Sequence, residues 1–401
     1  MLAKNFKNVP PVISERVSHI IRMTMADMAN LADLRPDSIR LENAETNLLP
    51  APHVIEATRN AVGVSKYNSY LPLHGRPELR QAISDRYYTD LGLRYDPEEE
   101  IVVTSGAGEA MLDALLTFVN PGDKVFLTNP TYSGMAQRVK LAGGVPAFTN
   151  LREQERWHLD PEDLRRVAKG CKVIFYMSPC MPTGTVFTRD ETKIIGEVAQ
   201  ENDSMILFNA VLDKIAYDGR EVVHPATLPG MRERTMIVGS VSKNYNMGGW
   251  RIGWIAGPRE FIKPVEDVHI FNGLMPSGYN QVGATAALKG PQDWVKKCVE
   301  INQRRRDVLL DALEHVYGLH SVKPEGGYYF IANISKLGVT SPEFCLKLLE
   351  QKNVAVTPMV AWGSDDFGYD HVRFVFTTEP EERLRKAGEL IRQFIHENYL
   401  K

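Results

Sequence analysis

Lys243 stands out in this sequence as a residue with chemical potential, because of its position and its neighbours. It follows Ser240 and Ser242 at the end of an apolar segment, so its amine can point into a cleft. Loss of water around a lysine lowers its pKa and makes the neutral amine a nucleophile for a carbonyl group. Arg251 lies eight residues further on, among glycines, and offers a fork for a phosphate. A lone lysine is usually solvent-exposed, but this combination favours a carbonyl-binding lysine beside a phosphate.

The segment 105–108, Ser-Gly-Ala-Gly, is a second candidate, since it follows a predicted strand and opens a predicted helix. Backbone N–H groups at a helix N-terminus bind phosphate, and glycines let the anion come close. A dinucleotide-binding G-x-G-x-x-G would need a glycine where the chain has Met111, and no G-K-[ST] loop occurs. The segment therefore suits one phosphate, with an ordinary tight turn as the alternative interpretation.

Alternating strands and helices must position these residues. Short β-branched or apolar runs predict strands, and amphipathic stretches predict helices between most of them. The predicted strands cover 101–104, 124–128, 145–148, 173–177, 205–208 and 235–239, and the predicted helices include 110–119, 134–142, 161–167 and 190–200. This alternation predicts an α/β fold with a mostly parallel central sheet and an active site beyond the carboxyl ends of its strands.

The pattern changes near residue 295. Charged and amphipathic helices are predicted over 293–313, 342–351 and 381–397, with strands near residue 330 and over 371–376. These elements predict a smaller C-terminal α+β domain. We therefore divide the chain into an N-terminal arm with part of the small domain (1–52), a large domain (53–295) and a small domain (296–401).

Composition narrows the function classes. The formal net charge of −3 gives no electrostatic footprint for nucleic acid or an anionic membrane. No apolar run is long enough for a transmembrane helix, and residues 1–7 lack the apolar core of a signal peptide. The four cysteines form no C-x-x-C pair and lie near no histidine cluster. We therefore expect no metal site, reduced thiols and a cytoplasmic protein.

Several motifs together give the chain a family resemblance. Ser-x-Ser-Lys at 240–243 is followed by Gly-x-Arg-x-Gly-Trp at 249–254. The pattern is completed by Tyr-Leu-Pro-Leu-His-Gly-Arg-Pro-Glu-Leu-Arg at 70–80, Val-Thr-Ser-Gly-Ala at 103–107, Pro-Thr-Gly at 182–184, Pro-Glu-Gly-Gly-Tyr-Tyr-Phe at 324–330 and Val-Arg-Phe at 372–374. Over nearly its whole length the sequence resembles the class I/II aminotransferases, pyridoxal-phosphate (PLP) enzymes of fold type I.

The resemblance implies a role for each matching residue. Lys243 forms the aldimine with PLP and carries the proton between the substrate Cα and the cofactor. Tyr132 stacks on the pyridine ring, and Arg373 binds the substrate α-carboxylate as a bidentate pair. Tyr70 reaches the phosphate of the neighbouring subunit, which implies a homodimer with shared active sites. The phosphate is held by the N–H groups of Ala107 and Gly108 together with Ser240 and Arg251, and Ser242 is a further cofactor-binding residue.

Three positions depart from the family pattern around the cofactor ring. Met181 replaces an asparagine that donates to O3′, Leu212 replaces a tyrosine that does the same, and Asn209 replaces the aspartate under the pyridine nitrogen. A carboxylate keeps that nitrogen protonated, whereas a neutral amide does not. Our hypothesis is that the ring is a weaker electron sink, tuned away from fast transamination. Compensation by other side chains is the alternative, with Glu109, Asn129 and Asn244 as candidates.

The segment 41–47, Leu-Glu-Asn-Ala-Glu-Thr-Asn, also departs from the family's G-x-G-E-P sequence. It is similar to the Ala-Glu-Asn of the ACC synthases, which eliminate a sulfonium group and do not transaminate. The position of this segment in the family makes Asn43 and Ala44 candidate substrate-binding residues.

Three functions are compatible with these observations. The leading interpretation is an aminotransferase that moves an amino group from an α-amino acid to a 2-oxo acid, with no second arginine identified for an acidic side chain. The second is a PLP enzyme of the same fold that runs elimination, cyclisation or oxidation, motivated by Asn209. The third is a non-catalytic regulator module, which the missing basic recognition helix disfavours.

Overall fold

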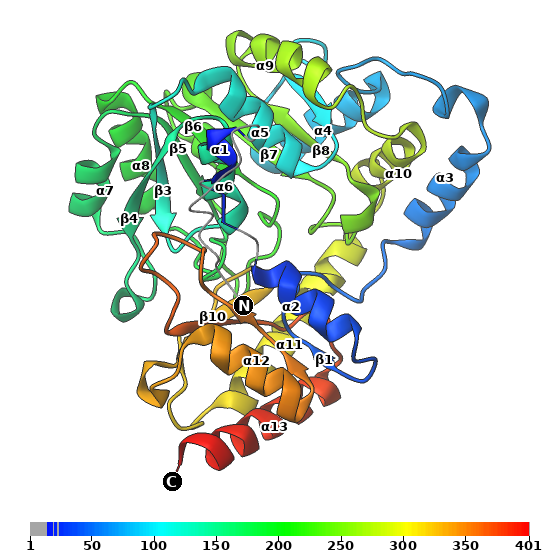
Figure 1. The fold of residues 1–401 in the computed structure, drawn as a ribbon. Coiled ribbons are helices and arrows are strands. Elements are labelled where there is room, and N and C mark those ends of the chain that lie inside the picture. The colour runs from blue at the N-terminus through cyan, green and yellow to red at the C-terminus, as the bar shows by residue number, and fades with distance from the viewer. Residues whose placement is uncertain (1–13, 19, 22–23, 401) are drawn as a thin grey trace.

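The computed structural model describes residues 14–18, 20–21 and 24–400. The first part of the predicted N-terminal arm, residues 1–13, and the segment tested for a signal peptide lie outside these residues. Figure 1 shows a large sheet flanked by helices, with a smaller group of strands and helices beneath it. Within the described part of the chain, no helix is both long and apolar enough to cross a lipid bilayer.

The central sheet has seven strands in the order β2-β8-β7-β6-β5-β3-β4. All neighbouring pairs are parallel except those of β8, which runs antiparallel to both β2 and β7. The strands are β2 (Ile101–Thr104), β3 (Lys124–Asn129), β4 (Val145–Asn150), β5 (Cys171–Met177), β6 (Met205–Asn209), β7 (Thr235–Ser240) and β8 (Gly253–Ala256). The mostly parallel sheet predicted from the sequence is confirmed, whereas the antiparallel strand β8 was not predicted.

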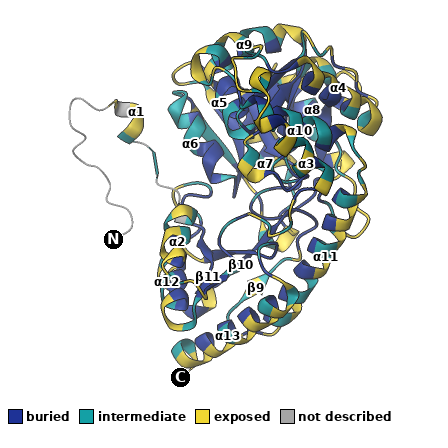
Figure 2. Ribbon diagram, turned by 90° about the vertical axis from the view of Figure 1, so that its right-hand side faces the viewer, coloured by how far each residue is buried: buried dark blue, intermediate teal, exposed yellow. Residues whose placement is uncertain are grey.

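Helices cover both faces of this sheet because its strands carry apolar residues on both sides. Val102 and Val103 are fully buried neighbours in β2, yet they belong to different apolar clusters on opposite faces. The helices that pack on the sheet are α4 (Pro77–Leu91), α5 (Ala107–Phe118), α6 (Ser133–Leu141), α7 (Pro161–Ala168), α8 (Arg189–Glu201) and α9 (Arg259–Asn272). Helix α10 (Gly278–Lys289) packs on α4, and α3 (Pro52–Val62) packs on α10. Figure 2 shows the central strands buried and the outward helix faces exposed.

A four-stranded antiparallel sheet forms the smaller part, in the order β12-β13-β10-β9. Its strands are β9 (His320–Ser321), β10 (Tyr329–Asn333), β12 (Thr357–Pro358) and β13 (His371–Val375), and its helices are α11 (Asp293–Leu313), α12 (Ser341–Lys352) and α13 (Glu381–Tyr399). The N-terminal segment returns here, since β1 (Ile39–Arg40) pairs in parallel with β11 (Val354–Ala355), and α2 (Thr24–Asp33) contacts α12. The predicted smaller α+β unit is confirmed.

Candidate functional site

A cavity of about 490 Å³ opens beyond the carboxyl ends of the central strands. Met177, Asn209 and Ser240, the last residues of β5, β6 and β7, all line it, as expected for a parallel sheet. The smaller part contributes Tyr328, Tyr329 and Trp362. Twelve of the predicted site residues meet here: Asn43, Ala44, Ala107, Gly108, Tyr132, Met181, Asn209, Leu212, Ser240, Ser242, Lys243 and Arg251.

A larger cavity of about 600 Å³ contains Asp213, Lys214 and His224. Of the residues predicted from the sequence as site residues, it includes Ser240 alone. The smaller cavity is therefore the candidate active site, because the chemistry-bearing residues converge there.

Lys243 lies just past the end of β7, half-buried in the cavity wall. Its Nζ donates a hydrogen bond to the carbonyl oxygen of Ala44. Burial lowers the pKa of Lys243 to about 8; Glu45 opposes this shift, while Arg373 and Arg251 reinforce it. A substantial neutral fraction at physiological pH makes the amine a competent nucleophile and proton acceptor.

A cradle of backbone and side-chain donors lies at the start of α5. The helix begins at Ala107 without a side-chain cap, so its first N–H groups remain available to an anion. Arg251 adopts a left-handed backbone (φ 55°) and lies against the turn, with Nη2 donating to the carbonyl of Ser105 at 3.3 Å. A Cβ on Gly106, whose φ is 88°, would lie 2.3 Å from Arg251 Nη2. These residues fit a phosphate group.

The slot beside this cradle has mostly apolar walls. Tyr132 and Met181 are half-buried and Leu212 is buried. The Asn209 amide is committed on its oxygen side, because Oδ1 accepts from the N–H of Val211 at 3.1 Å. Its Nδ2 donates to the Met111 sulfur at 3.7 Å, a weak acceptor, and both residues line the cavity. The slot therefore fits a flat heteroaromatic ring with an amide at its far end.

The three side chains considered as compensation for the altered ring contacts are engaged elsewhere. Glu109 accepts from the N–H of Ser105 at 2.5 Å. Asn129 donates to Asn150, and Asn244 donates to Asp213. The lining of the candidate cavity includes none of the three. Compensation by these residues is therefore not supported.

Arg373 on β13 is fully buried directly behind the cavity. Its guanidinium lies 4.3 Å from the centre of the Trp362 ring, and Nη2 donates to the carbonyl of Glu42 at 2.5 Å. Nε and Nη1 have no hydrogen-bond partner among the described residues. Burial lowers the pKa of Arg373 to about 10. Nε and Nη1 are therefore two separate free donors on a buried cation that can bond to carboxylate oxygens. Arg373 itself does not line the cavity, whereas Met25 and Trp362, which contact it, do.

Asn43 and Tyr70, two further residues predicted from the sequence, differ in their location relative to the cavity. Asn43 lines the cavity and donates to the Glu45 carboxylate at 2.7 Å. Tyr70 is 83% exposed and lies outside the cavity of its own chain.

Sequence reasoning missed several lining residues. Met25 and Trp362 carry no motif signal, because each reaches the site only through the packing of the smaller part. Tyr328 lies within the 324–330 motif and donates from its hydroxyl to the Lys243 carbonyl at 2.8 Å. That motif was the available signal for Tyr328, but it did not identify the contact.

Comparison with known proteins gives consistent results. The family described as "Aminotransferase class I and II" matches residues 37–390. An aspartate aminotransferase of Geobacillus stearothermophilus is 31% identical and covers 90% of this chain and 91% of its own. Aromatic-amino-acid aminotransferase 2 of Thermococcus litoralis is 29% identical over 97% of this chain and 99% of its own. The structure of a Thermus thermophilus aspartate aminotransferase with maleate superposes with a TM-score of 0.88 at 30% identity, covering 95% and 99% of the two chains.

Proposed function

The chain belongs to the family of class I and II aminotransferases, and we infer that it moves an amino group from an α-amino acid to a 2-oxo acid with PLP as cofactor. One observation supports this proposal most strongly: a half-buried lysine with a pKa of about 8 faces a cavity that also holds a phosphate cradle. When bound, PLP supplies an aldehyde and an electron-withdrawing ring that make the Cα–H of an amino acid acidic.

Different residues of the cavity are assigned to the phosphate and to the ring of the cofactor. We assign the phosphate to the N–H groups of Ala107 and Gly108 with Ser240, Ser242 and Arg251, all of which line the cavity. Tyr132 covers one face of the ring. Asn209 offers its Nδ2–H to the ring nitrogen, because its oxygen already accepts from Val211. Met181 and Leu212 offer no hydrogen bond to the ring hydroxyl and enclose it.

Lys243 is the catalytic residue of the proposal. Its Nζ accepts the proton from the substrate Cα and returns it on the cofactor side, which requires an amine that is neutral near physiological pH. The lowered pKa gives the amine a substantial neutral fraction in that range.

Arg373 positions the α-carboxylate through its free Nε and Nη1. Since Met25 and Trp362 cover Arg373, the substrate must move them aside or the smaller part must shift when the substrate binds.

The lining of the cavity indicates the class of amino donor. Met25, Tyr329 and Trp362 give it an apolar wall, and the cations that line it within the described chain are Lys243 and Arg251. Lys243 is assigned to proton transfer and Arg251 to the cofactor phosphate, so neither is free to bind a side-chain carboxylate. We therefore expect an uncharged or aromatic donor to be preferred over aspartate.

We also propose a cytoplasmic homodimer with domain boundaries near residues 53 and 296. Tyr70, Phe271 and Leu274 are exposed apolar side chains. Their segments are adjacent, because the N–H of Leu71 donates to Met275 Sδ. A grouped apolar surface of this kind suits a subunit contact.

The four cysteines are buried and free, which suits a reducing compartment.

The relatives named above are all transaminases, so elimination, cyclisation or oxidation is not favoured.

The test is a half-reaction: the holoenzyme is mixed with single amino acids without an acceptor, and released 2-oxo acid and pyridoxamine phosphate are quantified. We expect equal amounts of both, and none with Lys243→Ala. Release of ammonia without pyridoxamine phosphate would refute the assignment.

A further inference from the structure

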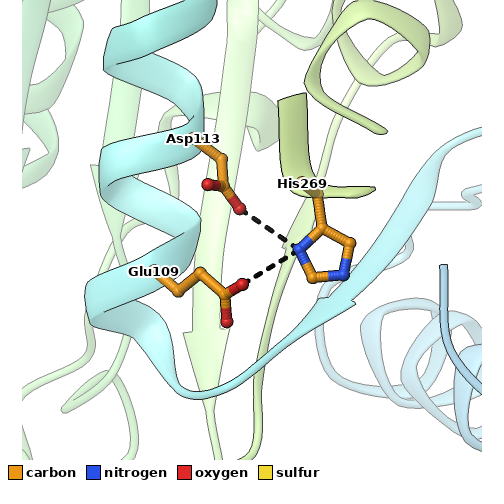
Figure 3. A group of neighbouring side chains, drawn as sticks. All are labelled: Glu109, Asp113 and His269. Carbon is orange, nitrogen blue, oxygen red and sulfur yellow. Dashed lines mark ion pairs between the residues drawn. The ribbon is translucent and has the colours of Figure 1, made fainter. Parts of the chain in front are cut away.

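Three buried titratable side chains lie close together, with ion pairs between the histidine and both carboxylates (Figure 3). Glu109 and Asp113 are one turn apart on α5, and His269 reaches them from α9. The side chains of Asp113 and His269 are fully buried, and that of Glu109 is 11% exposed. His269 Nδ1 lies 3.2 Å from Glu109 Oε1 and 3.3 Å from Asp113 Oδ2. One ligand atom from each residue lies within 4.8 Å of the other two.

The outward-facing atoms of the cluster are each held by a neighbour. Glu109 Oε2 accepts from the N–H of Ser105, and Asp113 Oδ1 accepts from Asn272 Nδ2 at 2.7 Å. His269 Nε2 lies 3.2 Å from the carbonyl oxygen of Leu73, a contact that requires the proton on Nε2. In a neutral imidazole this leaves the Nδ1 lone pair facing the two carboxylates. Outer contacts of this kind orient metal ligands in proteins.

The inward-facing atoms, by contrast, contact only one another, as ion pairs from His269 Nδ1 to the two carboxylates. Glu109 Oε1, Asp113 Oδ2 and His269 Nδ1 are buried and form no hydrogen bond within the described chain. Buried polar atoms left in this state are uncommon and costly. Two carboxylate oxygens and a lone pair also repel one another, so a positive charge must lie among them. A proton on Nδ1 is one candidate, because Asp113 and Glu109 outweigh burial and raise the pKa of His269 to about 9. The nitrogen–oxygen distances of 3.2 and 3.3 Å are, however, longer than the usual length of about 2.7–2.9 Å for a hydrogen bond between charged groups.

The distances suit a metal ion. Ligand atoms about 2.0–2.1 Å from a tetrahedral zinc ion lie about 3.3–3.4 Å apart. The two nitrogen–oxygen distances, 3.2 and 3.3 Å, are close to that separation. One imidazole and two carboxylates suit a borderline cation such as Zn²⁺ and suit Mg²⁺ poorly.

We propose that Glu109, Asp113 and His269 bind one Zn²⁺, with water in the fourth position. The ion fixes Glu109, which in turn holds the Ser105 N–H in the turn ahead of the phosphate cradle. Space for the Glu109 carboxylate depends on Gly273, where a Cβ would lie 1.4 Å from Oε1. The site is structural and does not depend on the proposed transamination.

The test is a metal analysis of the intact holoenzyme. The wild type is stripped with a chelator, equilibrated with Zn²⁺, desalted and assayed by mass spectrometry for metal content. We expect about one zinc per chain, and X-ray absorption should show one imidazole nitrogen with oxygen ligands and no sulfur. A wild type that retains no zinc would refute the proposal and leave a proton as the cation of the cluster.

Variants locate the ion. His269→Gln should abolish stoichiometric binding, and Asn272→Ala should weaken it about 10- to 100-fold by releasing Asp113. The matched control is His224→Gln, which removes another buried histidine paired with an aspartate, Asp213, at 3.0 Å and should leave zinc content unchanged. Zinc that persists in a folded His269→Gln protein, judged by circular dichroism, would place the ion elsewhere and overturn the assignment. If His269→Gln does not fold, Asn272→Ala decides alone, and undiminished affinity in that variant would equally overturn it.

Discussion

Gly106→Ala separates the phosphate cradle from the rest of the fold. Gly106 has φ 88° and ψ 162°, a backbone region that is essentially restricted to glycine. An added Cβ would lie 2.3 Å from Arg251 Nη2, so the guanidinium must leave the turn. The substitution therefore introduces backbone strain and also displaces the cation that we assign to the cofactor phosphate.

The two effects have different magnitudes and different readouts. Strain in this backbone region destabilises the fold by roughly 1–3 kcal/mol. Loss of a charge-assisted hydrogen bond costs about 1.5–3 kcal/mol. This loss corresponds to a Kd for PLP that is about tenfold to a hundredfold higher. Urea denaturation measures the first effect, and fluorescence titration of the apoenzyme with PLP measures the second.

Gly92→Ala is the matched control. Gly92 has φ 70° at the end of α4, and nothing lies within 4 Å of a Cβ added there. It should lose about 1–2 kcal/mol of folding stability from backbone strain and bind PLP normally. Wild-type affinity in Gly106→Ala would refute the role of Arg251 as a phosphate ligand.

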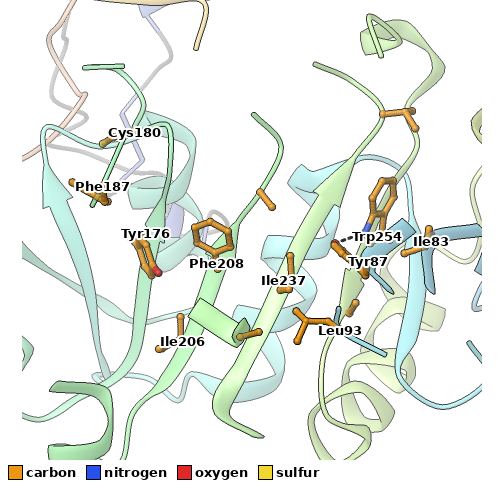
Figure 4. Close-up of a cluster of buried hydrophobic side chains, with 14 of the residues drawn as sticks. Ile83, Tyr87, Leu93, Tyr176, Cys180, Phe187, Ile206, Phe208, Ile237 and Trp254 are labelled. Carbon is orange, nitrogen blue, oxygen red and sulfur yellow. Dashed lines mark hydrogen bonds between the residues drawn. The ribbon is translucent and has the colours of Figure 1, made fainter. Parts of the chain in front are cut away.

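Four further outcomes are expected. In the apoenzyme, the rate of amine labelling at Lys243, followed by peptide mass spectrometry, should increase with pH and reach its midpoint near pH 8, since burial favours the neutral amine. A midpoint near pH 10.5 would contradict this expectation. Arg373→Lys keeps the charge but loses the free Nε and Nη1 donors, so KM for the amino acid should rise about 10- to 100-fold with a smaller change in kcat. An unchanged KM would argue against carboxylate binding. Asn209→Asp should speed the half-reaction about tenfold in stopped-flow absorption by favouring a protonated ring nitrogen, whereas an equal or slower rate would show that the amide is no handicap. Tyr87→Phe removes the hydroxyl that accepts a hydrogen bond from the buried Trp254 Nε1–H at 2.8 Å (Figure 4). The free energy of unfolding in urea should therefore fall by about 1–3 kcal/mol, with PLP affinity unchanged. A stability equal to that of the wild type would mean that this hydrogen bond contributes nothing.

Much of the central sheet could be predicted because its signals are local. The apolar runs of β3, β5 and β6 are bounded by turn residues, and their short length together with these turn residues separates them from the helices between them. Strand β8 was missed because it has four residues and begins at Gly253, inside a motif interpreted for its arginine. Its antiparallel direction follows from pairing with β2 and β7, which no local pattern records.

By itself the sequence determined the α/β alternation, the lysine after a strand and the glycine turn that opens a helix. These features depend on residues within about ten positions of one another, so spacing is sufficient to reveal them. Only the tertiary structure decided that Met25 and Trp362 cover Arg373, and that His269 meets Glu109 from 160 positions away. Such contacts arise from the packing of separate elements. The pKa of Lys243 and the hydrogen bonding of Arg373 follow from the same packing, because both depend on which atoms exclude water from these side chains in the folded chain.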